Sequence, residues 1–108
     1  MERPPSLTNA VDRGASIKAK HRRLAILRFL EAQPGYRGNE RVVGDYLQEF
    51  ALSGSGAEVR TCFDFLERSG LVANRIVEDV LVSALTPAGL DFLEGRSLAE
   101  GVRRPLPE

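Results

Sequence analysis

The chain has 108 residues, of which 43% are hydrophobic and 28% are charged, and its formal net charge at pH 7 is zero. These values are typical of a soluble globular domain and exclude a disordered chain, a collagen and a coiled-coil rod. One Cys and one His supply neither an internal disulfide nor a zinc site, so we expect no metal and no cofactor. Without a secretory signal or an apolar stretch long enough to span a bilayer, we expect a cytoplasmic protein that does not associate with membranes.

Positive charge is concentrated near the N-terminus. Seven Lys and Arg residues outnumber two acidic residues in positions 1–28, and five of the seven fall between Lys18 and Arg28. Such a cluster is most often a solvated helix face, but it is also a pattern that binds phosphate groups. We expect Lys18, Arg22 and Arg23 to contact phosphates.

The first elements of the chain are an arm and a helix. Residues 1–16 contain two prolines and lack apolar periodicity, so we predict a flexible arm. A helix is predicted from Ile17 to Gln33, where apolar residues recur at spacings of three and four. Pro34-Gly35 ends this helix, and residues 36–38 are long enough only for a stub of strand.

Asn39 is predicted as the N-cap of a second helix, because its side-chain oxygen can accept hydrogen bonds from the first-turn amides. One face of this helix is apolar and is expected to be buried: Val43, Tyr46, Leu47 and Phe50. The segment 53–56, Ser-Gly-Ser-Gly, then interrupts the helical pattern.

A third helix is predicted from Ala57 to Ser69. Ser55 and Glu58 have the spacing of a capping box, in which each side chain bonds the backbone amide of the other residue. Gly70 is placed for a left-handed C-cap. The apolar inner face is expected to consist of Val59, Cys62, Phe63 and Leu66.

The periodicity changes after Gly70. Residues 71–76 and 80–85 are rich in aliphatic and β-branched side chains, and we predict an antiparallel hairpin across Val77-Glu78-Asp79. Thr86 and Pro87 are predicted as the N-cap and first residue of a short last helix. Residues 96–108 are predicted to form an irregular tail.

The order of these elements indicates a fold class. Two helices joined by a short Gly-containing turn are typical of a helix-turn-helix, in which the second helix reads DNA. A hairpin directly after that helix makes the unit a winged helix. We therefore predict a mainly α fold with a small β-hairpin, a winged helix-turn-helix in residues 17–95 with a three-helix core, a wing and a short C-terminal helix.

Several blocks of the sequence resemble known families. Val59…Phe63…Leu66…Gly70-Leu71-Val72, followed by Leu85-Thr86-Pro87-Ala88-Gly89-Leu90, resembles the reader helix, wing and final helix of MarR- and ArsR-like winged-helix regulators. With the segments 32–40, 94–96 and 101–105, the sequence also resembles a small family carried by Mu-like bacteriophages and prophages, over roughly residues 17–105. Members of that family are described as ArsR-like or as phage proteins of unknown role.

The resemblance implies a DNA-binding homodimer joined through its first and last helices. The ArsR resemblance also implies a thiolate metal sensor, which a chain with one Cys cannot form. The hairpin tip, which lies near DNA in such regulators, is acidic here (Glu78-Asp79), so we expect it to repel phosphate.

The outer face of the third helix carries the residues that we expect to meet DNA: Arg60, Thr61, Asp64 and Arg68. Arg60 is suited to bond a guanine, Thr61 a phosphate or a thymine methyl group, and Arg68 a backbone phosphate. Asp64 would repel phosphate unless it orients an arginine four residues away. The alternative to a DNA-reading surface is a solvated helix face with scattered charges. We assign Glu58 to helix capping rather than to the recognition of a cytosine.

Four other residues have simple structural interpretations. His21 is expected to be exposed, and Cys62 to be a small buried side chain. Phe29 and Phe65 lie off the apolar stripes of their helices and indicate either flank packing or a patch for self-association. No nucleophile with a base, phosphate loop or carboxylate pair is evident in the sequence, so we expect no enzyme activity.

Two functions therefore remain open. The first is a phage or prophage DNA-binding protein, a dimeric transcriptional regulator whose partner is double-stranded DNA. The alternative is an adaptor that uses the same fold to bind a phage or host protein. The zero net charge and the acidic hairpin tip favour the adaptor.

Overall fold

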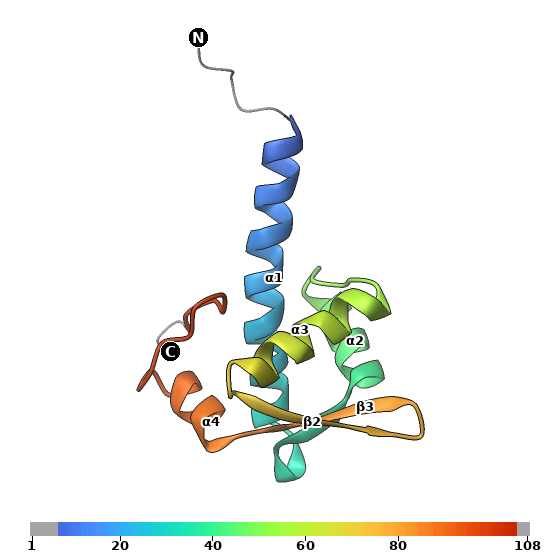
Figure 1. The fold of residues 1–108 in the computed structure, drawn as a ribbon, viewed down its shortest axis with the longest axis vertical. Coiled ribbons are helices and arrows are strands. Elements are labelled where there is room, and N and C mark those ends of the chain that lie inside the picture. Colours follow the sequence, from blue (N-terminus) through green and yellow to red (C-terminus); the bar gives the residue numbers. More distant parts are fainter. Residues whose placement is uncertain (1–6, 106–108) are drawn as a thin grey trace.

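Helices dominate the computed structural model, which describes residues 7–105, with side chains from residue 13 onward (Figure 1). The elements in chain order are α1 (Leu7–Glu31), the 3-10 turn η1 (Pro34–Tyr36), β1 (Arg37–Asn39), α2 (Glu40–Glu49), α3 (Gly56–Arg68), β2 (Val72–Val77), β3 (Val80–Leu85) and α4 (Pro87–Leu93). The described part of the chain is a mainly helical domain, with four α-helices and one three-stranded antiparallel sheet.

α1 is longer than predicted, because it begins at Leu7 rather than at Ile17. Its N-terminal part projects from the rest of the molecule, and the side chains of residues 13–18 are all exposed (Figure 1). Extending an existing helix adds one hydrogen bond for each residue fixed, and no proline interrupts residues 7–16. The predicted arm is therefore helical from Leu7 onward, while residues 1–6 lie outside the described part of the chain.

The other helices begin at the predicted capping residues. Asn39 accepts hydrogen bonds from two first-turn amides of α2, both at 3.0 Å. Ser55 and Glu58 form the predicted capping box of α3, with hydrogen bonds of 3.0 and 3.1 Å. Thr86 accepts a hydrogen bond of 3.1 Å from a first-turn amide of α4. Because these bonds satisfy amides that have no intrahelical partner, they fix where each helix starts.

The core lies between α1, α2, α3 and the sheet, and it is mostly aliphatic. α3 buries all four side chains predicted for its inner face. For α2 the prediction was wrong at Phe50, whose side chain is 55% exposed, because the helix ends at Glu49 and the chain turns there. The largest fully buried side chains are Phe63, Phe92, Ile26, Leu27, Leu30, Leu47, Leu66 and Val43.

The sheet has the strand order β1-β3-β2, and both pairs of strands are antiparallel. The β2–β3 connection is one residue shorter than predicted, since Val77 pairs with Val80. The two turn residues, Glu78 and Asp79, have positive φ angles of 49° and 67°. This backbone is typical of two-residue hairpin turns, whose twist matches that of the paired strands.

The chain after α4 is irregular, yet it is attached to the body of the protein. Val102 is only 8% exposed, and the backbone amide of Arg103 donates a hydrogen bond of 3.2 Å to the carbonyl of Lys20 in α1. The described part of the predicted tail therefore packs against α1, while residues 106–108 lie outside the described range.

Candidate nucleic-acid interface

α3 has one buried face and one exposed face. The residues predicted to meet DNA all lie on the exposed face: Arg60, Thr61, Asp64 and Arg68. The capping box fixes where α3 begins and therefore where this exposed face starts. The Glu58 side chain bonds the backbone of Ser55 as its capping partner. The structure thus brings the four predicted residues together on one helix surface next to the β2–β3 hairpin.

Arg60 is held by two elements outside α3. Its Nε and Nη2 donate hydrogen bonds to the two carboxylate oxygens of Glu40, each at 2.8 Å. Nη2 also donates to the backbone carbonyl of Asp79 in the hairpin turn, at 2.8 Å. One Glu40 oxygen accepts a further bond from the backbone amide of Leu81. Arg60 therefore connects α3 to the start of α2 and to the hairpin.

Glu40 and Arg60 each stabilise the charged form of the other. The hydrogen bond from Arg60 lowers the pKa of Glu40, against the opposing effect of burial. Glu40 in turn raises the pKa of Arg60. Both side chains therefore stay charged at neutral pH. Sequence reasoning missed Glu40, because an acid in the first turn of a helix is already explained by the helix dipole, and its partner lies 20 residues away.

The polar contacts of Thr61, Asp64 and Arg68 are local to α3. Thr61 donates its hydroxyl hydrogen to the carbonyl of Ala57, at 2.9 Å. Asp64 and Arg68 form the predicted four-residue ion pair at 3.2 Å, with both side chains more than 60% exposed. Ion pairs with this exposure contribute little to stability, so Arg68 remains free to exchange Asp64 for another anion.

Arg22 does not lie on this surface, and its predicted phosphate contact must be corrected. The residue is only 5% exposed. Its Nε donates to the carbonyl of Leu52 at 2.8 Å, and its Nη2 to the carbonyl of Ser53 at 3.1 Å. A guanidinium has several donors in a rigid fork, and here it satisfies two carbonyls of the α2–α3 connection.

Arg23 is also occupied within the protein. Its guanidinium lies 3.8 Å from the centre of the Phe65 ring, and Nη1 donates a bond of 2.6 Å to the carbonyl of Gly101. Arg23 thus joins α1 and α3 to the tail rather than presenting its full fork to a phosphate. Because Phe65 is covered in this way and Phe29 is only 9% exposed, the two rings form no patch for self-association.

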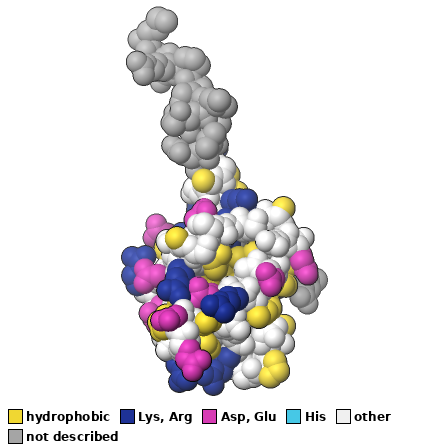
Figure 2. Space-filling model, turned by 90° about the vertical axis from the view of Figure 1, so that its right-hand side faces the viewer, with side chains coloured by type: hydrophobic (Ala, Val, Ile, Leu, Met, Phe, Trp, Pro, Cys, Tyr) yellow, Lys and Arg dark blue, Asp and Glu magenta, His cyan; other side chains and the backbone are white. Residues whose placement is uncertain are grey.

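Charges of both signs occupy the face formed by α3 and the hairpin. Figure 2 shows blue and magenta side chains interleaved on the side of the molecule where the hairpin turn and the start of α3 lie. α3 and the hairpin together contain three arginines and five carboxylates. The arginines are Arg60, Arg68 and Arg75, and the carboxylates are those of Glu58, Asp64, Glu67, Glu78 and Asp79. Lys18, an exposed residue of α1, adds a cation near Glu58 at the start of α3.

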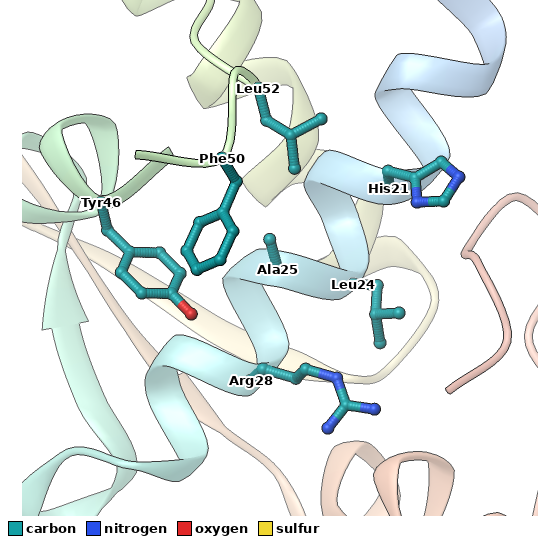
Figure 3. A pocket seen from close by; sticks show the side chains of 7 residues that line it. All are labelled: His21, Leu24, Ala25, Arg28, Tyr46, Phe50 and Leu52. Atoms are coloured by element: carbon teal, nitrogen blue, oxygen red, sulfur yellow. The ribbon is translucent and has the colours of Figure 1, made fainter. Parts of the chain in front are cut away.

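An apolar hollow of about 190 Å³ lies on a different side of the protein, between α1 and the end of α2. Figure 3 shows its lining, with the side chains of α1 meeting those of α2 and the following turn: His21, Leu24, Ala25, Arg28, Tyr46, Phe50 and Leu52. His21 is exposed, as predicted.

Among residues 13–105, whose side chains the structure describes, no group of three or more His, Cys, Asp or Glu residues could hold a metal ion. Cys62 is 3% exposed and belongs to the core. Within the same range, no helix is both long and apolar enough to cross a membrane.

Comparisons with known proteins give one relative. No family model matches the sequence, and no solved structure matches it. The chain is 35% identical over 91 residues to gp26 of Escherichia phage Mu, which is described as an uncharacterized protein. The match covers 84% of this chain and 94% of the relative. This protein therefore belongs to the family of phage Mu gp26.

Proposed function

We propose that this protein is a winged-helix DNA-binding protein of a Mu-like phage or prophage and acts as a transcriptional regulator. The observation that carries the proposal is the exposed face of α3, which follows α2 after a short connection and lies beside the β2–β3 hairpin. This order and placement support a helix-turn-helix reader with a wing. α3 would enter the major groove of double-stranded DNA with its N-terminal half.

The contacts that fit this proposal are only part of those predicted from sequence. Arg60, Thr61 and Arg68 can face a duplex, whereas Arg22 is buried and Arg23 is engaged with the tail. Of the three α1 cations predicted to contact phosphates, Lys18 is the one that is exposed. With about three phosphates neutralised by one protomer, the logarithm of the binding constant should fall with the logarithm of salt concentration with a slope of about −3.

The test is retention on duplex DNA in a buffer of about 50 mM salt, with Arg68→Ala compared with Arg96→Ala. Both changes remove one exposed, ion-paired arginine, but Arg96 follows α4 and is not on the α3 face. Arg68→Ala should weaken binding to all duplexes and reduce the salt slope by about one, while Arg96→Ala should leave both unchanged. Absence of wild-type binding to any duplex would reject the proposal.

A second candidate function, an adaptor for a phage or host protein, is favoured by one observation. The α3 and hairpin face carries more carboxylates than arginines, and Arg60 and Arg68 are both already paired with carboxylates. Such a face attracts a DNA backbone weakly. If the folded protein passes through a duplex DNA column at low salt, this candidate becomes the better explanation.

We also propose that the protein forms a homodimer through α1. Ile17, which is 52% exposed, lies one helical turn before His21 on α1. His21 and the exposed Phe50 both line the apolar hollow. Helices gain most of their stability from packing, and α1 of a second copy would pack against the projecting part of this helix and fill the hollow.

A further inference from the structure

The guanidinium of Arg60 has two edges that can each form a pair of parallel hydrogen bonds. The side edge consists of Nε and Nη2, and the end edge consists of Nη1 and Nη2. Glu40 occupies the side edge with both carboxylate oxygens. The second hydrogen of Nη2 is engaged by the carbonyl of Asp79, and no acceptor among the described residues bonds Nη1.

Glu40 is itself fixed in place. It is the first residue of α2, directly after the N-cap Asn39, and its side chain is only 14% exposed. One of its oxygens also accepts the hydrogen bond from the backbone amide of Leu81 in β3. The carboxylate therefore has two independent anchors, whereas the Arg60 side chain remains 46% exposed.

This arrangement limits what Arg60 can recognise. A guanine is read by two parallel hydrogen bonds to its O6 and N7 atoms, and these need two guanidinium nitrogens on one edge. With the side edge held by Glu40, only the end edge can form the pair. The Asp79 carbonyl must then leave Nη2, so the hairpin turn has to move aside or exchange its bond for the base.

We propose that Glu40 is a positioning residue, which aims the end edge of Arg60 at a guanine, and that the Asp79 carbonyl covers this edge until DNA displaces it. The inference rests on the proposed DNA-binding function and assigns it a base preference. Arg60 would act as a reader of one guanine rather than as one more phosphate contact.

The experiment is selection of bound duplexes from a random-sequence pool, using wild-type protein, Glu40→Gln, Arg60→Ala and the double variant. Wild-type protein should enrich guanine at one position. Arg60→Ala should lower that preference by about tenfold or more. Glu40→Gln should also lower the guanine preference, while the affinity for random duplexes should stay the same or rise slightly. The double variant should show the same loss of guanine preference as Arg60→Ala alone, because the two residues act as one unit.

Three results would overturn the inference. Glu40→Gln could leave the guanine preference intact, the losses from the two single changes could add in the double variant, or both changes could weaken all duplexes equally, as expected for a phosphate contact. Cooperative melting of every variant well above the temperature of the binding assay excludes loss of folding as the cause.

A measurement without DNA separates this inference from the proposed function. In nuclear magnetic resonance spectra of the free protein, the Nε hydrogen of Arg60 should be protected from exchange, and Glu40→Gln should remove that protection. A protected Nε without any duplex binding would reject the DNA function and the guanine assignment but keep the Glu40 anchor. An unprotected Nε would reject the anchor itself.

Discussion

Arginine side chains join distant parts of this chain. Arg22 bonds carbonyls that lie 30 and 31 residues away, Arg23 a carbonyl 78 residues away, and Arg60 a carboxylate 20 residues away. Each guanidinium supplies several donors from one rigid group, so it can satisfy acceptors on two segments at once. Three of the five cations expected to face DNA therefore stabilise the fold in addition to, or instead of, contacting a ligand.

Arg22→Ala should destabilise the protein by about 2 kcal/mol, because hydrogen bonds from a charged donor to the Leu52 and Ser53 carbonyls are lost. The measurement is urea unfolding followed by circular dichroism. Lys20→Ala removes an exposed cation from the same helix and should change stability by less than about 0.5 kcal/mol. A stable Arg22→Ala protein with weakened DNA binding would instead support the phosphate contact originally predicted.

Glu40 should make stability depend on pH in the acidic range. Its pKa in the folded protein is lowered, chiefly by the hydrogen bond from Arg60, so its stabilising contribution is complete above the unfolded pKa of about 4.3. The contribution is lost as pH falls below that value, through the folded pKa. We therefore expect the free energy of unfolding, measured in urea from pH 6 downward, to fall less with decreasing pH for Glu40→Gln than for wild type. Arg60→Ala should reduce the decline too, and unchanged slopes in both variants would contradict the ion pair.

At the scale of the elements, the ends of the helices depend on single side chains. The Ser55 hydroxyl accepts the amide of Glu58 at 3.1 Å. Ser55→Ala should therefore lower the free energy of unfolding by about 1 kcal/mol. Ser53→Ala, in the same connection but outside the capping box, is the control and should have a much smaller effect. Equal midpoints in urea for both variants would show that the cap contributes nothing.

Two glycines inside helices should respond to alanine with opposite signs. A Cβ atom on Gly89 of α4 would collide with the carbonyl oxygen of Leu71, so Gly89→Ala should cost about 1–3 kcal/mol through overpacking. A Cβ atom on Gly44 of α2 would meet nothing within 4 Å, so Gly44→Ala should stabilise by up to about 1 kcal/mol through helix propensity. Thermal unfolding of the two variants checks both signs, and a stabilised Gly89→Ala would contradict the packing of α4 on Leu71.

At the scale of the whole molecule, the proposed homodimer has its interface at the projecting α1 and the adjoining hollow. Sedimentation should detect a dimer, and Ile17→Asp combined with Phe50→Asp should weaken it by about a hundredfold or more, since a buried unpaired charge costs several kcal/mol. Ile76→Asp, at a hydrophobic position 57% exposed on the hairpin, should leave the dimer unchanged. A wild-type protein that sediments as a monomer at all concentrations would reject the dimer. A dimer that is broken only by Ile76→Asp would place the interface at the hairpin instead of at α1.

The amino-acid sequence by itself determined where most elements begin and which helix faces are buried. Asn39, Ser55 and Thr86 act on amides two or three residues away, and the inner face of α3 follows from the helical period, so both can be read locally. The start of α1 and the exposure of Phe50 escaped this reasoning, because no strong local marker encodes where a helix extends or where the chain turns from the core.

Only the tertiary structure decided what the charged side chains do. Lys18, Arg22 and Arg23 are neighbours in sequence, yet they point to solvent, to the α2–α3 connection and to the tail. Glu40 and Arg60 carry no mutual signal in the sequence, and they meet because α2 and α3 pack side by side next to the hairpin. Long flexible cations select their acceptors from whatever the fold brings within reach. For that reason a run of basic residues predicts positive charge on a helix, whereas the use of each charge depends on the packing of the whole chain.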